Sequence, residues 1–171
     1  MQNIAQMSKD GDLAGVRAAL ARGEDVNLKD SRNSTGLMWA AYEMHNAIVS
    51  LLLDQPTVDL NCCDSNGETA LIYAIAAPQR DKNIKREIDY HAVEEYGNVE
   101  AVRLLLADPR LTTQNQRRHN GWTPAMFAIV NSAKDSLRVL VAHPSVDLKA
   151  RDSMGRSLQG IARCVTQRID Y

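Results

Sequence analysis

The stretch GWTPAMFAI at 121–129 decides the fold, because two related stretches occur in the same chain: GETALIYAI at 67–75 and NSTGLMWAA at 33–41. A threonine occupies the same place in each copy, and the spacing from Thr35 to Thr69 is 34 residues. The next interval, to Thr123, is 54 residues, and Ser157 follows after another 34. Self-similarity at a fixed period of this length is typical of repeat proteins, which stack one structural unit on the next.

Each copy predicts a short first helix that begins at the threonine, whose hydroxyl can accept a hydrogen bond from a free backbone N–H group. Pro124 suits the first position of such a helix. A second apolar segment also repeats, as VSLLLDQPTVDLN at 49–61, VRLLLADPRLTTQ at 102–114 and LRVLVAHPSVDLK at 137–149. It predicts a second helix that ends before Pro56, Pro109 or Pro144, because proline cannot continue a helix.

Small residues predict close packing between the units. Ala40, Ala74 and Ala128 occupy the same place in their first helices, so neighbouring helices can approach to about 8–10 Å. One helix pair cannot bury its own apolar faces, whereas stacked neighbours can. The pattern therefore favours an all-α array.

The repeated stretches resemble the ankyrin repeat family, whose unit is close to D-x-x-G-x-T-P-L-H-x-A-A-x-x-G-H, followed by a V-x-L-L-L helix and a turn ending in D-V-N. The residues that match this unit are Asp30, Thr35, Leu37, Ala40, Ala41, His45, Asp64, Gly67, Thr69, Leu71, Ala74, Gly121, Thr123, Pro124 and Ala128. The chain departs from it where Met38, Ile72 and Met126 replace the histidine, and where Arg118 replaces the aspartate. The resemblance implies an ankyrin-repeat solenoid of helix-turn-helix units joined by hairpin-like loops.

We expect one domain over 1–171, built from five units. An N-terminal capping unit spans 1–29, central repeats span 30–63, 64–117 and 118–151, and a C-terminal cap spans 152–171. The long middle repeat contains extra residues at about 78–96, between its two helices. Two interpretations of this insertion remain open: a tolerated loop with an elongated second helix, or a finger beside the concave face that contacts a partner.

Composition limits the classes of partner and compartment. Lys and Arg number 20 against 21 Asp and Glu, a net charge of -1, so we expect neither nucleic acid nor an anionic membrane as the main partner. No apolar run approaches the roughly 20 residues that span a bilayer. Cys62 and Cys63 are adjacent and Cys164 is alone, which favours reduced thiols in a cytoplasmic or nuclear protein.

Patterns typical of catalytic and cofactor sites are missing from the sequence. The histidines and cysteines lack the clustered spacing of metal ligands, and the glycines recur once per turn rather than in a phosphate-binding loop. The basic spot at Arg117, Arg118 and His119 is narrower than a nucleic-acid interface requires. We therefore expect a protein that is not an enzyme, with no metal, cofactor or small-molecule substrate.

The resemblance implies that a partner protein binds the turn tips and the exposed side of the first helices. The corresponding residues are Ser31, Arg32, Ser34, Tyr42, Glu43, Ser65, Asn66, Glu68, Ala76, Ala77, His119, Asn120, Trp122, Val130 and Asn131. Tyr42 and Trp122 are expected to occupy equivalent exposed regions as aromatic anchors, with a Trp122 ring lying on the neighbouring turn as the alternative. We expect a monomeric, non-catalytic adaptor or scaffold, or alternatively an inhibitor that occludes an enzyme's surface.

Overall fold

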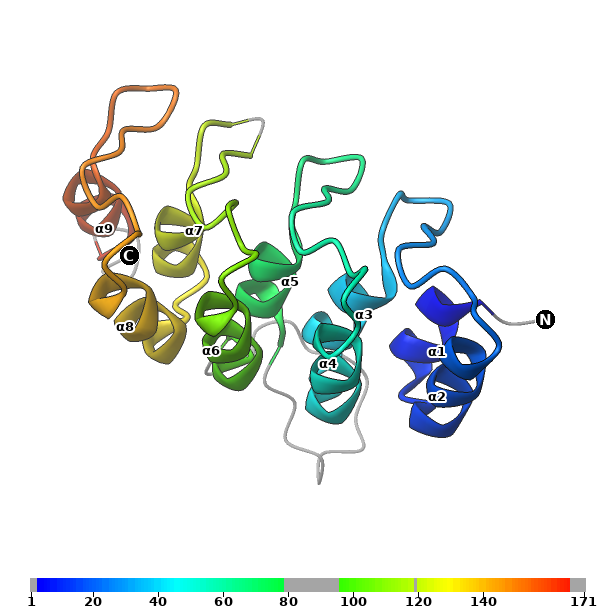
Figure 1. The fold of residues 1–171 in the computed structure, drawn as a ribbon. Coiled ribbons are helices and arrows are strands. Elements are labelled where there is room, and N and C mark those ends of the chain that lie inside the picture. Colours follow the sequence, from blue (N-terminus) through cyan, green and yellow to red (C-terminus); the bar gives the residue numbers. More distant parts are fainter. Residues whose placement is uncertain (1–2, 79–95, 119, 167–171) are drawn as a thin grey trace, which may run out of the picture.

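The computed structural model describes residues 3–78, 96–118 and 120–166, and within them it shows a row of helix pairs and no named strand (Figure 1). The first helices are α1 (Ile4–Asp10), α3 (Gly36–Tyr42), α5 (Ala70–Ala76) and α7 (Pro124–Val130). The second helices are α2 (Leu13–Ala21), α4 (Asn46–Leu53), α6 (Val99–Ala107) and α8 (Lys134–Ala142). The last helix, α9 (Leu158–Thr166), packs against α7 in the place of a further first helix. The predicted all-α solenoid is confirmed.

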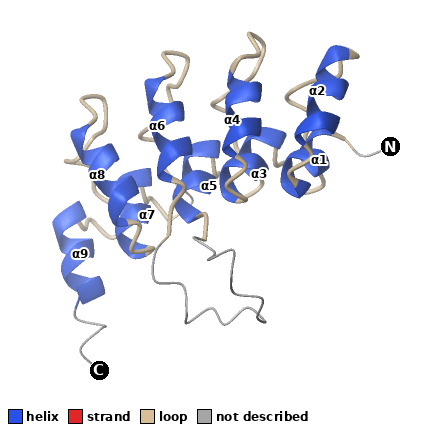
Figure 2. Ribbon diagram, turned by 90° about the horizontal axis from the view of Figure 1, so that it is seen from below, coloured by secondary structure: helices blue, strands red, loops and turns tan. Residues whose placement is uncertain are grey.

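The helix pairs form an arc. First helices line its inner, concave side and second helices line its outer side (Figure 2). The loops that join one unit to the next project together beyond one end of the helices (Figure 1). The concave side therefore combines the projecting turn tips with one surface of each first helix.

The predicted threonines do begin the first helices. Thr35, Thr69 and Thr123 are the N-cap residues of α3, α5 and α7, and Pro124 occupies the first turn of α7. The hydroxyls of Thr35 and Thr123 each accept a hydrogen bond from the backbone N–H three residues later, at 3.4 Å. The Thr69 hydroxyl is buried and has no hydrogen-bond partner among the described residues.

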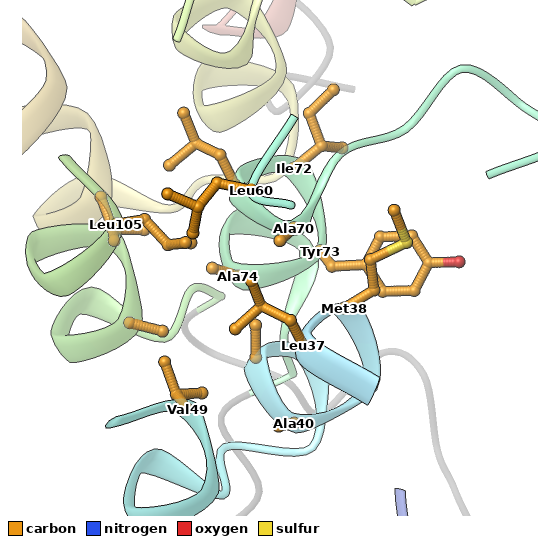
Figure 3. Packing of buried hydrophobic residues seen from close by; sticks show 14 of the residues in the cluster. Leu37, Met38, Ala40, Val49, Leu60, Ala70, Ile72, Tyr73, Ala74 and Leu105 are labelled. Atoms are coloured by element: carbon orange, nitrogen blue, oxygen red, sulfur yellow. The ribbon is translucent and has the colours of Figure 1, made fainter. Parts of the chain in front are cut away.

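The core runs continuously between units. Ala40, Ala74 and Ala128 are fully buried, as the small-residue pattern predicts. Figure 3 shows Leu37 and Val49 from one unit beside Ala74 and Leu105 from the next. Burial of these side chains depends on the neighbouring unit, so the stability of the array rests on contacts between units as well as within them.

A ladder of asparagines ties the inter-unit loops together. The Asn27 side chain donates to the Thr57 carbonyl and accepts from the Asp59 N–H, at 2.8 and 2.7 Å. Asn115 makes the same pair of bonds one step further along, donating to Ser145 and accepting from Asp147, both at 2.7 Å. Asn61 links the middle units in the same way. Each asparagine thus fixes the spacing of the loop that follows it.

The insertion leaves and re-enters the fold at neighbouring points. Pro78 and Tyr96 form an antiparallel bridge, and the Gly97 N–H donates to the Ala77 carbonyl at 2.7 Å. The Asn98 N–H then donates to the Ala74 carbonyl at 2.7 Å, just as the His45 N–H donates to Ala40 in the preceding unit. Residues 79–95 lie outside the described residues, so the finger hypothesis stays a prediction.

The predicted extension of the second helix into the insertion is wrong at this junction, because α6 begins only at Val99. Gly97, with φ 105°, separates α6 from the bridge at Tyr96. Met44 and Ser132 adopt the same left-handed conformation at the equivalent places in other units, with φ of 63° and 55°. The turn between the two helices is therefore preserved, and the extra residues are added outside it.

Deleting residues 78–96 and joining Ala77 to Gly97 is expected to leave a folded array. The new connection, Ala77-Gly97-Asn98, has the length of Glu43-Met44-His45 in the preceding unit. Because loop closure costs grow slowly with length, the free energy of unfolding should change by about 1 kcal/mol or less. Thermal unfolding followed by circular dichroism measures this. Deleting 77–96 instead shortens the turn by one residue and should destabilise; equal behaviour of both deletions would contradict the proposed turn register.

Candidate partner-binding face

Aspartates at the base of the loops shape the turn tips. One oxygen of Asp30 accepts from the N–H groups of Arg32 and Ser34, at 2.8 and 2.9 Å. Asp64 makes the same two bonds in the next unit, both at 2.8 Å, and so does Asp152 in the last, at 3.0 and 2.8 Å. The carboxylate thus fixes the backbone conformation of these three turn tips, and with it the positions of their exposed residues.

The second oxygen of the aspartate reaches an aromatic side chain nine residues later, on the first helix. The Trp39 indole N–H donates to Asp30 at 2.8 Å, and the Tyr73 hydroxyl donates to Asp64 at 3.0 Å. The Tyr73 hydroxyl also lies 2.9 Å from the Ser34 hydroxyl of the preceding unit. These two turns are therefore connected through their aspartates to buried rings on the first helices.

Arg118 and Phe127 replace this pair in the unit that follows. Phe127 has no polar hydrogen to give a carboxylate, and the Arg118 guanidinium lies 4.5 Å from the centre of its ring. Arg118 also forms an ion pair with Glu68 of the preceding turn. Burial raises the pKa of Glu68, an effect that the charge of Arg118 only partly offsets. The two departures from the repeat therefore compensate each other.

Three aromatic rings meet on the first helices. Trp39 contacts Tyr73 edge-to-face with ring centres 5.8 Å apart, and Tyr42 lies 6.2 and 6.1 Å from these two rings. The Lys9 ammonium lies 4.3 Å from the centre of the Trp39 ring, and Arg32 lies 5.8 Å from it on the turn side. Such ring pairs add stability beyond their buried area. Trp39 and Tyr73 are only 7% and 8% exposed, so they belong to the core and hold the half-buried Tyr42 in place.

The predicted site residues divide by exposure. Those exposed on the turn tips are Ser31, Arg32, Ser65, Asn66 and Asn120. Those half-buried, on the tips or at the ends of first helices, are Tyr42, Glu43, Glu68, Ala76, Trp122, Val130 and Asn131. His119 lies outside the described residues. The tips are also tied together, since the Ser65 hydroxyl donates to the Arg32 carbonyl at 3.0 Å and the Ser153 hydroxyl to the Asn120 carbonyl at 2.7 Å.

Two of the predicted residues cannot contact a partner as expected. Ser34 is fully buried because its hydroxyl packs against the Tyr73 hydroxyl of the next unit. Ala77 is fully buried where the chain turns from α5 toward the insertion. Both corrections have one cause: the positions beside an exposed tip or helix end point into the joint between units.

Tyr42 and Trp122 do not occupy equivalent places. Tyr42 ends α3, where Ala76 and Val130 stand in later units, whereas Trp122 precedes α7 and corresponds to Ser34. The Trp122 ring packs against both apolar clusters of the fold. It therefore contributes to the core between units.

The support of Tyr42 by Lys9, Trp39 and Tyr73 was not predicted from the sequence. Trp39 and Tyr73 are buried, so they act by positioning the residues of this face. A signal for the rings was present: an aromatic residue follows the loop aspartate or its replacement by nine positions at 30 and 39, 64 and 73, and 118 and 127. Lys9 had no comparable signal, because it reaches Trp39 from a different unit.

We next consider metal sites, reactive thiols and membrane-spanning helices among the described residues. They contain no group of three or more His, Cys, Asp or Glu side chains arranged to hold a metal ion. Burial and the neighbouring Asp59 carboxylate raise the pKa of the Cys62 thiol to about 11, so it is protonated near neutral pH and a weak nucleophile. No described helix is long and apolar enough to cross a bilayer.

Comparison with known proteins identifies the family. A sequence profile described as "Ankyrin repeats (3 copies)" matches residues 4–86 and 90–161. The chain belongs to the ankyrin-repeat family. Ankyrin repeats are protein–protein interaction modules, and the exposed turn tips described above are consistent with that role.

Similar proteins carry this repeat in different settings. The chain is 28% identical to the putative ankyrin repeat protein YahD of Escherichia coli, over 72% of this chain and 67% of YahD. It is 29% identical to the probable E3 ubiquitin-protein ligase XBOS32 of Oryza sativa, over 99% of this chain but 33% of that protein. Osteoclast-stimulating factor 1 of Rattus norvegicus is 38% identical over 34% of this chain and 27% of its own length. The latter two proteins thus extend well beyond the matched repeats.

Acid is expected to weaken the Asp30 turn. Burial raises the pKa of Asp30, but the hydrogen bonds from Ser34 and Trp39 and the nearby Arg32 outweigh it, so the pKa lies below its ordinary value. A lowered native pKa stabilises the fold above the unfolded value of about 3.9, and this stabilisation is lost as pH falls through the native pKa.

Asp30→Asn should therefore lower the urea midpoint at pH 7, and the gap between variant and parent should narrow progressively below about pH 4. Asp25→Asn, on an exposed residue of the preceding turn, is the control with a smaller expected change at pH 7. A gap for Asp30→Asn that stays constant down to acid pH would show that the carboxylate charge contributes nothing at this turn.

Proposed function

We propose that this protein is a non-catalytic adaptor that binds a partner protein through its concave face. Two residues of this face carry the proposal: Arg32 is exposed on its turn tip and Tyr42 is half-buried at the end of α3. Both lie beside the Trp39 ring, which is buried and holds them in place. Rigid aromatic side chains with nearby Arg are the residues that most often dominate binding energy at interfaces. Because the turns are already held by hydrogen bonds, little conformational entropy would be lost on binding.

Free thiols support an intracellular setting for this function. Cys62, Cys63 and Cys164 are all unpaired in the structure, and unpaired thiols persist where the compartment is reducing. We therefore propose that the adaptor acts in the cytoplasm or nucleus.

Site-specific photo-crosslinking in the native cell tests the face. A photoreactive amino acid at Arg32 or Asn66, on exposed turn tips, is expected to capture one and the same protein. The same group at Ser50 or Arg103, exposed on second helices, should not capture it. Capture only from the second helices would place the interface on the convex side.

The affinity of variants for the captured protein then measures how much the concave residues contribute to binding. Arg32→Glu combined with Tyr42→Ala is expected to weaken binding at least about tenfold, whereas Ser50→Glu with Arg103→Glu should leave it unchanged. Circular dichroism must show that both variants remain folded. If the captured protein is an enzyme and loses activity when bound, the protein is an occluding inhibitor rather than an adaptor.

A further inference from the structure

Asn98 joins two units of the array through a buried side chain. The residue is 1% exposed, and its amide nitrogen donates to the Ala41 carbonyl at 3.0 Å and to the Asn46 side-chain oxygen at 2.7 Å. Both acceptors belong to the preceding unit, since Ala41 lies near the end of α3 and Asn46 begins α4. The amide oxygen accepts from the Ala101 N–H at 3.1 Å and so caps α6. One side chain thus starts a helix and binds the unit before it.

The Ala41 carbonyl lies directly before a residue of the concave face. It belongs to the peptide group that joins Ala41 to Tyr42, the last residue of α3. A carbonyl in the last turn of a helix has no partner within the helix, and here the Asn98 amide supplies one from the next unit. This hydrogen bond restrains the backbone that carries Tyr42, and with it the position of the ring.

The backbone of Asn98 binds the neighbouring first helix as well. Its N–H donates to the Ala74 carbonyl near the end of α5, at 2.7 Å. α3 and α5 lie next to each other on the concave side (Figure 2). Asn98 also follows closely after the bridge between Pro78 and Tyr96, where the insertion re-enters the fold. A single residue therefore connects the ends of two first helices to the base of the insertion.

Equivalent residues of other units show that capping and the bond to the preceding unit are separate roles. His45 stands at the start of α4 as Asn98 does at the start of α6. Its Nε2 atom lies 3.3 Å from the Lys9 carbonyl near the end of α1, although its side chain makes no capping bond. Asp12 instead caps α2 by a bond within its own unit, at 2.8 Å. Asn98 combines the two roles.

We propose that Asn98 is a positioning residue for the partner-binding face, which it serves by holding Tyr42 in place relative to the end of α5. The proposal rests on the proposed function, because Tyr42 is one of the two residues that carry it. Asn98 is buried, so it acts on the face without touching a partner, through the peptide group between Ala41 and Tyr42.

Two substitutions separate positioning from capping. Asn98→Ser keeps a good N-cap residue, but its side chain is too short to reach the Ala41 carbonyl. Asn98→His introduces the side chain that reaches the preceding unit from the start of α4 without capping it. Asp12→Ala is the matched control, because it removes the cap of another second helix. Circular dichroism of the full chain shows which variants fold.

The Tyr42 ring reports the position of the face in the free protein. Its edge-to-face contact with Trp39 makes its NMR ring resonances sensitive to small displacements. With isotope-labelled tyrosine, and Tyr42→Phe to assign the signals, Asn98→Ser is expected to shift the Tyr42 resonances. Asn98→His and Asp12→Ala should leave them close to the parent. A role in capping alone predicts instead that Asn98→Ser resembles the parent. Should Asn98→His not fold, Asn98→Ser against Asp12→Ala decides.

Affinity for the protein captured from Arg32 completes the test. Asn98→Ser is expected to weaken binding at least about fivefold, and Asn98→His and Asp12→Ala by less than about twofold. Unshifted Tyr42 resonances in Asn98→Ser, or an equal shift in Asp12→Ala, would overturn the proposal, and so would a shift without loss of affinity. If no protein is captured from the turn tips, the proposed function fails, and the Tyr42 resonances then show separately whether Asn98 positions the ring.

Discussion

Leu106→Ala is expected to lower the free energy of unfolding by about 2–4 kcal/mol, the cost of truncating a buried leucine. Val141→Ala, at the same position of the next second helix, should cost about 0.5 kcal/mol or less. Leu106 is 7% exposed and Val141 is 46% exposed. The side chains are alike in chemistry, so the contrast comes from whether another second helix covers them.

Urea unfolding of both variants measures the contrast. Leu106→Val and Val141→Leu are useful companions, because they exchange the two side chains and keep the positions. If side-chain size set the cost, Val141→Leu would behave like native Leu106; the prediction is that it changes stability little. Equal losses of stability for Leu106→Ala and Val141→Ala would contradict the prediction that coverage by a following second helix sets the cost.

Local sequence features could predict the repeating unit, because they act within a few residues of one another. A threonine that caps a helix, a proline that ends one and an alanine that permits close packing all reappear at Thr123, Pro144 and Ala128 at the expected places. The loop turns follow from the same kind of short-range contact, between Asp64 and the N–H groups just after it.

The burial of a side chain by the neighbouring unit could not be predicted from local sequence in the same way. Ser34 looks like an exposed loop residue until Tyr73, 39 residues away, is placed against it. Val141 occupies the same place in its helix as Leu106, yet it is 46% exposed against 7% for Leu106. The candidate face was therefore predicted at the level of elements, while the direction of individual side chains required the packing between units.

Asn61→Ala is expected to lower the free energy of unfolding by about 3–4 kcal/mol, because each well-formed hydrogen bond contributes a net of roughly 1 kcal/mol. Asn27→Ala and Asn115→Ala should cost less, about 2 kcal/mol each. The Asn61 amide donates to the Arg110 carbonyl at 2.9 Å. Its oxygen accepts from the Thr112 and Thr113 N–H groups and the Thr113 hydroxyl, at 2.8, 3.2 and 3.1 Å. Asn27 and Asn115 make two such inter-unit bonds each.

The position of Asn61 adds to its effect. It joins the two halves of the array beside the unit that carries the insertion, and stability in such an array is approximately a sum of unit and nearest-neighbour terms. Urea unfolding of the three alanine variants gives the ranking, and amide hydrogen exchange shows where the fold opens. For Asn61→Ala, faster exchange should appear on both sides of the joint, in α4 and α6, whereas Asn27→Ala should affect mainly α2. Three equal losses would mean that the number of bonds at each asparagine does not set the strength of the ladder.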